Sequence, residues 1–171
     1  MYKSFINELI RICQSNSNKK ILNDITNLYK MYTPICLEKI INDEISKNFE
    51  MSKLSVIKNG DTPYYKYNLF TSNNFDVFDI KWQKDSFSKI HDHPDNGCIV
   101  YMYNQGNLTE SNFIKLNKGQ LKFTSNKNIT HGDIGYKIGD KYLHQIKCNI
   151  YSETLHIYIP GNFKMKCYTF V

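Results

Sequence analysis

Apolar side chains follow a helical pattern over the first 50 of the 171 residues. They recur every three or four positions, which places them on one face of an α-helix. Thr33-Pro34 suits the start of a later helix, because threonine caps helix N-termini and proline fits the first turn. The positions that carry this pattern are Phe5, Ile6, Leu9, Ile10 and Cys13, then Ile21, Leu22, Ile25, Leu28 and Tyr29, then Leu37, Ile40, Ile41 and Ile45.

From about residue 55 the pattern changes to short aromatic and β-branched runs separated by Asn, Asp and Gly. Runs of this kind are typical of β-strands, and several of them without intervening helices indicate an antiparallel sandwich or barrel. The clearest examples are residues 75–82, 98–103, 133–139 and 154–159.

The length and the apolar content of 41% allow one good hydrophobic core. We therefore expect a single domain over residues 1–171, in which helices of residues 1–50 pack on a barrel formed by residues 55–171. No run approaches the roughly 20 apolar residues of a membrane span, and the N-terminus lacks the apolar run of a signal peptide. The expected location is the cytoplasm, without a membrane partner, and a monomer is the default expectation.

Charge and cysteine content exclude other classes. The formal charge of +6 comes almost entirely from scattered lysines, since Arg11 is the only arginine, and no nucleic-acid recognition motif accompanies it. The five cysteines form an odd set without CxxC spacing, which argues against a disulfide framework or a structural zinc site. Nucleic acid is therefore not expected as a partner.

Two of the five histidines stand one residue apart in the stretch KIHDHPDNGC. Side chains two positions apart on a strand leave the same face, so His91 and His93 can converge on one metal ion. Imidazole is a common ligand of transition metals, although an HxH pair also occurs as two exposed loop histidines. A third ligand is expected from a neighbouring strand, and His144 lies in the strand-like run GDKYLHQIKC. His131, in a turn-like stretch, is expected at the surface.

Three segments carry a family resemblance. SKIHDHPDNGCIVYMYNQGNLTES resembles the metal-site segment of thiol dioxygenases of the cysteine dioxygenase type, which belong to the cupin β-barrel superfamily. GDKYLH is similar to the family's third-ligand strand, and TLHIYIPGNF to a later strand that ends in a proline. With a weaker similarity over the N-terminal helices, the resemblance covers most of the chain. It implies a mainly β (α+β) fold, a jelly-roll-like cupin barrel preceded by helices.

The resemblance implies an iron(II) centre held by His91, His93 and His144, without a carboxylate ligand. Three neutral imidazoles leave about three positions of an octahedron for the thiolate and amine of a substrate and for dioxygen. In the animal enzymes a cysteine in the place of Cys98 forms a thioether bond with a tyrosine. The matching tyrosine here is Tyr158, so the same crosslink is expected.

Three alternating residues, Thr154, His156 and Tyr158, correspond to a Ser-His-Tyr relay of the family. On a strand all three side chains point to one side, so the resemblance implies that His156 holds the phenol of Tyr158 toward the iron. The same alternation is also that of an ordinary strand face that packs into a barrel.

One position departs from the family pattern. In the family, an arginine in a stretch like YYKYNLF pairs with the substrate carboxylate. Alignment through Tyr65, Asn68 and Leu69 assigns that place to Tyr67, so Tyr65 and Tyr67 are the substrate-binding candidates. A tyrosine offers one neutral hydrogen bond, which contributes about 1 kcal/mol against about 1.5–3 kcal/mol for a charged bond. Lys66 replaces the arginine only if the strand register slips by one residue.

The expected function is an iron(II)-dependent thiol dioxygenase that oxidises L-cysteine with O2 to cysteine sulfinate. Its partners are then a small thiol and dioxygen. Two alternatives stay open: a dioxygenase for another small thiol, such as a mercapto acid, cysteamine or an N-terminal cysteine of a peptide, and a metal-binding cupin module without catalytic activity.

Overall fold

The computed structural model describes residues 2–15, 18–32, 34–47 and 49–170, and it contains the expected helices. Thr33, the expected helix cap, lies outside the described residues. Among the helices in the described part, none is long and apolar enough to cross a membrane. The helices are α1 (Tyr2–Ser15), α2 (Asn18–Lys30) and α3 (Pro34–Lys47).

The rest of the chain forms strands, joined in part by two short 3-10 turns at Met51–Lys53 and Asn117–Gly119. The strands are β1 (Leu54–Lys58), β2 (Pro63–Thr71), β3 (Asp76–Trp82), β4 (Ile90–His91), β5 (Cys98–Met102), β6 (Asn107–Lys115), β7 (Leu121–Thr130), β8 (Ile134–Lys137), β9 (Tyr142–Ile150), β10 (Ser152–Tyr158) and β11 (Cys167–Tyr168).

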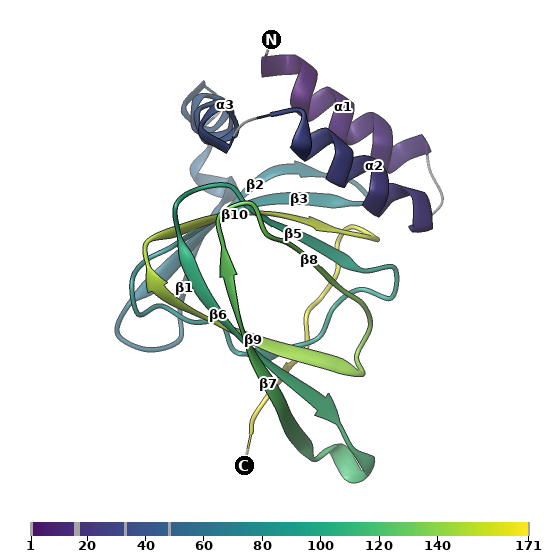
Figure 1. Cartoon of the computed structure of the whole chain (residues 1–171), viewed down its shortest axis with the longest axis vertical. Coiled ribbons are helices and arrows are strands. Elements are labelled where there is room, and N and C mark those ends of the chain that lie inside the picture. Colours follow the sequence, from purple (N-terminus) through teal and green to yellow (C-terminus); the bar gives the residue numbers. More distant parts are fainter. Residues whose placement is uncertain (1, 16–17, 33, 48, 171) are drawn as a thin grey trace.

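Within the described residues the strands form two antiparallel sheets, in the orders β1-β2-β3-β10-β5-β8 and β11-β4-β9-β6-β7. The two sheets face each other and enclose the barrel interior, while the three helices lie over the outer face of the first sheet (Figure 1). The expected mainly β fold with N-terminal helices is therefore confirmed.

The helices are held by an apolar cluster that they share with the first sheet. Phe5 and Leu9 of α1 are fully buried in it, together with Leu155 and Ile157 of β10. The ring of Tyr29 on α2 stacks on the ring of Tyr101 with a centroid distance of 4.2 Å. Since burying one large apolar side chain contributes about 1.5–3 kcal/mol, this cluster fixes the helices on the sheet.

Strand β10 lies between β3 and β5 and is buried at all seven positions. Its alternate residues point into the barrel on one side and toward the helices on the other. A second apolar cluster fills part of the barrel interior, and the polar side chains of β10 line what remains. The residues of this second cluster are Tyr64, Ile80, Trp82, Met102, Leu108, Ile129, Ile146 and Cys148.

Candidate metal centre

Strands β4 and β9 bring three histidines together inside the barrel. They are antiparallel neighbours, and His91 lies directly opposite His144 in their register. His93 follows β4 and is buried with them. Nε2 of His144 lies 3.0 Å from Nε2 of His91 and 3.0 Å from Nε2 of His93. The predicted third histidine thus comes from a neighbouring strand.

Hydrogen bonds on the far side of two rings show where their protons lie. Nδ1 of His91 is 2.8 Å from the backbone oxygen of Lys89, and Nδ1 of His144 is 2.6 Å from Oε1 of Glu110. A carbonyl and a carboxylate only accept hydrogen bonds, so both Nδ1 atoms donate. Both Nε2 atoms therefore carry lone pairs, which repel at 3.0 Å unless a cation lies between them. The donor set fits a bound metal ion.

Burial keeps these rings neutral. Burial lowers the pKa of His91 to about 3, and it also lowers the pKa of His93 and His144. Neutral imidazole is the form that binds a metal. The cluster found among the described residues consists of these three histidines, with no carboxylate among its ligand atoms.

Glu110 stands behind His144 as its partner outside the cluster. It lies on β6, opposite Ile146 of β9, and its Oε2 is 3.3 Å from Nζ of Lys137. Burial alone would raise its pKa, but the hydrogen bond with His144 and the charge of Lys137 lower the pKa of Glu110 to about 2. An ionised carboxylate that accepts from a ligating histidine fixes the orientation of the ring. The sequence analysis did not single out Glu110. The signal that could have indicated it is an acidic residue two positions after Leu108, on the apolar face of β6.

Cys98 and Tyr158 are brought together as a directly opposed pair on β5 and β10. Both are buried, and both line the cavity that contains the histidines. Burial raises the pKa of each side chain. The geometry therefore places the two proposed crosslink partners next to each other.

The three residues of the expected relay all face the barrel interior, but only the first link is present. Thr154 Oγ1 lies 2.8 Å from Nε2 of His156. The rings of His156 and Tyr158 are 6.1 Å apart between centroids, and Nδ1 of His156 has no hydrogen-bond partner among the described residues. A residue that the sequence did not indicate extends this row of hydrogen bonds at the Thr154 end, because Nε1 of Trp82 donates to Thr154 Oγ1 over 2.8 Å.

Strand β2 presents Lys66 to the cavity instead of Tyr67, which corrects the expectation from the alignment. Lys66 lines the cavity, whereas Tyr65 and Tyr67 are not among its lining residues. The hydroxyl of Tyr67 accepts from the backbone N–H of Glu50 at 3.0 Å, and its ring stacks on Phe49. The physical reason is the register of β2 with β3: Lys66 lies opposite Ile80, which belongs to the apolar cluster inside the barrel, whereas Tyr67 lies opposite Asp79 on the other face.

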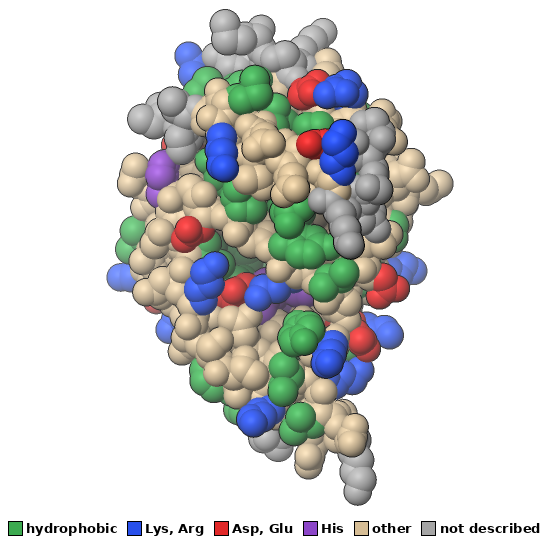
Figure 2. Space-filling view, turned by 45° about the vertical axis from the view of Figure 1, so that its right-hand side comes forward, with side chains coloured by type: hydrophobic (Ala, Val, Ile, Leu, Met, Phe, Trp, Pro, Cys, Tyr) green, Lys and Arg blue, Asp and Glu red, His purple; other side chains and the backbone are tan. Residues whose placement is uncertain are grey.

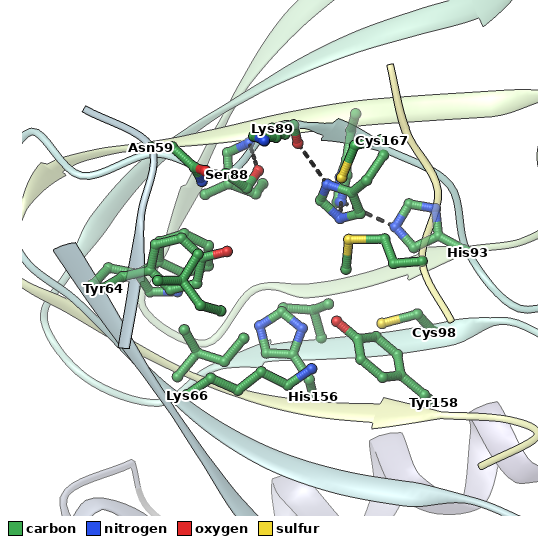
Figure 3. Close-up of a pocket in the computed structure, with 18 residues that line it drawn as sticks. Asn59, Tyr64, Lys66, Ser88, Lys89, His93, Cys98, His156, Tyr158 and Cys167 are labelled. Atoms are coloured by element: carbon green, nitrogen blue, oxygen red, sulfur yellow. Dashed lines mark hydrogen bonds between the residues drawn. The ribbon is translucent and has the colours of Figure 1, made fainter. Parts of the chain in front are cut away.

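One cavity of about 270 Å³ is lined by the three histidines and by Lys66, Trp82, Cys98, His156 and Tyr158. Figure 3 shows Lys66, His156 and Tyr158 along one wall and His93 and Cys167 on the opposite side, with Tyr64 at the far end. Histidine atoms are visible at the bottom of a hollow near the middle of one face, between lysine and hydrophobic side chains (Figure 2). A small ligand can therefore reach the histidines from outside.

Two antiparallel sheets around a buried three-histidine centre define a cupin-type metal site. Residues 39–170 match the family model described as cysteine dioxygenase type I. Because the match spans most of the chain, the protein belongs to the cysteine dioxygenase type I family.

Solved structures confirm the fold. A Trp-to-Phe variant of oxalate decarboxylase from B. subtilis is 18% identical with a TM-score of 0.50, covering 70% of this chain and 32% of that one. Another structure of oxalate decarboxylase from Bacillus subtilis, at pH 4.6, is also 18% identical with a TM-score of 0.50, and it covers 70% of this chain and 31% of that one. The chain thus spans about a third of the oxalate decarboxylases, and these likenesses concern the fold alone. No curated protein matches the sequence.

Proposed function

We propose that this chain is an iron(II)-dependent dioxygenase that adds both atoms of O2 to the sulfur of a small thiol and gives a sulfinic acid. L-Cysteine is the leading substrate. The observation that carries the proposal is the convergence of three histidine Nε2 atoms on a buried point inside a cavity, in a member of the cysteine dioxygenase family. One thiol and one O2 balance one sulfinic acid, so no further reductant is required.

His91, His93 and His144 would hold the metal, and iron(II) bound there would supply the positive charge and the redox chemistry for O2. Three neutral ligands leave that positive charge undiminished, which favours the thiolate over the thiol of a bound substrate. Glu110 holds His144 in the orientation that presents Nε2. The barrel wall keeps the reacting sulfur away from bulk water.

Lys66 is the proposed partner of the substrate carboxylate. Its Nζ lies 3.6 Å from the ring centroid of Phe78 and 4.9 Å from that of Tyr158, inside the cavity. Burial lowers the pKa of Lys66 to about 8, so the side chain is still mostly charged at pH 7. A charged hydrogen bond to a carboxylate contributes about 1.5–3 kcal/mol. This favours cysteine or a mercapto acid over cysteamine, which has no carboxylate.

Tyr158 and Cys98 are proposed to form a thioether during turnover. The new C–S bond replaces the S–H bond of Cys98 and one ring C–H bond of Tyr158, and O2, the substrate of the enzyme, takes up the two hydrogens and two electrons and becomes hydrogen peroxide. Their direct opposition across β5 and β10 supports the proposal. In this reading Tyr158 presents its phenol to the substrate, and Thr154 and His156 support the same wall of the cavity.

The test is oxygen uptake by the iron-loaded protein with cysteine, cysteamine and 3-mercaptopropionate, followed by mass analysis after reaction under ¹⁸O2. We expect sustained oxygen uptake and a sulfinic acid that carries two labelled oxygens. The His91→Ala variant should show neither the uptake nor the labelled product. His131→Ala is the matched control, because this histidine bonds the backbone of Asn104 away from the centre. Metal binding without uptake for any thiol would support the non-catalytic cupin module instead.

A further inference from the structure

Trp82, Thr154 and His156 form a buried chain of hydrogen bonds along one wall of the cavity. Trp82 ends β3, and it pairs with Ser152, so Thr154 is its diagonal neighbour on the same face of β10. Trp82 Nε1 lies 2.8 Å from Thr154 Oγ1, which lies 2.8 Å from His156 Nε2. The three residues are 3%, 0% and 6% exposed, so water does not compete for these bonds.

The chain of bonds has one direction. An indole N–H only donates, so the oxygen of Thr154 accepts from Trp82. The threonine hydroxyl then has one proton to place, and among its partners in the described residues only Nε2 of His156 can accept it. Nε2 of His156 is therefore an acceptor. Since burial lowers the pKa of His156 far below its usual value, the ring is neutral and its single proton lies on Nδ1.

The Nδ1–H group of His156 is a hydrogen-bond donor that lacks an acceptor among the described residues. Nδ1 of His156 is buried and has no partner among the described residues. The ring lines the cavity between Lys66 and Tyr158 (Figure 3). A buried donor without a partner costs about 1–3 kcal/mol, so an acceptor that enters the cavity recovers this energy.

We propose that Trp82 and Thr154 fix His156 as the Nδ1–H tautomer and thereby set a neutral donor in the cavity wall for an anionic oxygen of the ligand. Trp82 and Thr154 are positioning residues, because they act through His156. The ligand half of this inference rests on the proposed function, since the oxygen belongs either to the substrate carboxylate or to the product sulfinate. Lys66 on the same wall adds the complementary charge.

The tautomer is measured by ¹⁵N NMR of histidine-labelled full-length protein in which zinc occupies the three-histidine centre, with His156→Gln to assign the signals. We expect a protonated Nδ1 and an unprotonated Nε2 at His156 in the parent and in Thr154→Ser, which keeps the hydroxyl. Thr154→Val and Trp82→Phe should shift the ring toward the other tautomer. A parent His156 protonated at Nε2, or a tautomer unchanged in both variants, would overturn the assignment.

The ligand half is tested by adding cysteine, cysteamine and hypotaurine without oxygen and following the His156 Nδ1 signal. A shift with cysteine alone assigns the donor to a carboxylate, and a shift with hypotaurine assigns it to a sulfinate. A signal that moves with none of the three would overturn this half. In oxygen uptake, Trp82→Phe should raise the KM for the thiol about fivefold, the equivalent of one neutral hydrogen bond, and Thr154→Ser should not. The zinc-protein spectra involve no turnover, so their outcome is independent of whether the chain oxidises thiols.

Discussion

The two faces of strand β10 are both buried, yet their polar residues serve different purposes. On the inner face, His156 and Tyr158 line a cavity that a ligand can enter, and Thr154 bonds to His156 on the same face. On the outer face, Leu155 and Ile157 pack tightly below the helices. Polar groups beside a cavity can satisfy their hydrogen bonds with a ligand, whereas those in a packed layer must do so with one another.

On the outer face, polar groups in the packed layer are left partly without hydrogen bonds. Asp79 of β3 is fully buried and accepts a hydrogen bond from the hydroxyl of Tyr103, while Lys81 pairs with Glu153 at 3.8 Å. One carboxylate oxygen of Asp79 and one of Glu153 have no hydrogen-bond partner among the described residues. Burial raises the pKa of Asp79 to about 7. Substitutions on the inner face should therefore change chemistry, and those on the outer face stability.

The strongest test of this division is His144→Ala. It removes one of three ligands and leaves Glu110 without its partner, so we expect loss of most of the bound iron and of nearly all oxygen uptake. Metal analysis and uptake measure the effect, with His131→Ala as control. A His144→Ala protein as rich in iron as the parent would contradict the ligand assignment.

Leu155→Ala is the matched change on the outer face of the same strand. It empties space in the packed layer under the helices, and we expect a loss of about 2–5 kcal/mol in the free energy of unfolding. Iron content and the KM for cysteine should stay near the parent values. Urea unfolding measures the loss, and a large drop in iron content of the folded variant would show that the two faces are not independent.

Asp79→Asn tests the titration of the outer face. Because the folded pKa of Asp79 is raised, its stability contribution is complete below about pH 3.8 and is lost as the pH rises to about 7. Over that window this group alone should lower stability by about 1.4 kcal/mol per pH unit. Unfolding at several pH values should give a flatter profile for Asp79→Asn, and identical slopes for parent and variant would refute the assignment.

Lys66→Met is a change on the inner face that should alter substrate specificity. Its effect should be smaller than that of His144→Ala. Loss of a charged bond should raise the KM for cysteine by about 10- to 100-fold and leave cysteamine unchanged. Above pH 8 the parent should approach the variant, because Lys66 loses its charge there. Tyr67→Phe is the control and should change neither KM. An equal rise for both thiols would point to a packing role for Lys66.

Cys98→Ser should have the mildest effect. Cys98 is not a proposed ligand, so part of the activity should remain, while the thioether with Tyr158 cannot form. Intact mass and gel mobility of the parent after turnover should show a species that the variant lacks. Parent protein that turns over steadily without this species would rule out the crosslink.

The sequence was sufficient for features that depend on local pattern and order. The helical spacing predicted α1 to α3, and the HxH pair predicted a cluster, because His91 at the end of β4 and His93 two positions later point to the same centre. Cys98 and Tyr158 were paired through the family resemblance, and the register of β5 and β10 gives the same pair.

Features that depend on how distant strands meet were not predictable. Alignment with the family assigned Tyr67 to the cavity, but the register of β2 with β3 sets Lys66 opposite Ile80 and gives the cavity face to Lys66. Trp82 reaches Thr154 only because β3 and β10 are neighbours in a particular register. The burial of Asp79 depends on helices that cover its face, and no pattern near residue 79 indicates that cover.

The place of β2 near the edge of its sheet also bears on how such a protein can change during evolution. A one-residue slip in β10 would exchange Thr154, His156 and Tyr158 for Glu153, Leu155 and Ile157, and would destroy both buried faces at once. The same slip in β2, which has only β1 beyond it, would replace the two cavity side chains of Tyr64 and Lys66 by their neighbours and leave the histidines in place. Insertions and deletions in β2 can therefore change the substrate preference while the metal centre stays the same. Those in β10 would prevent folding.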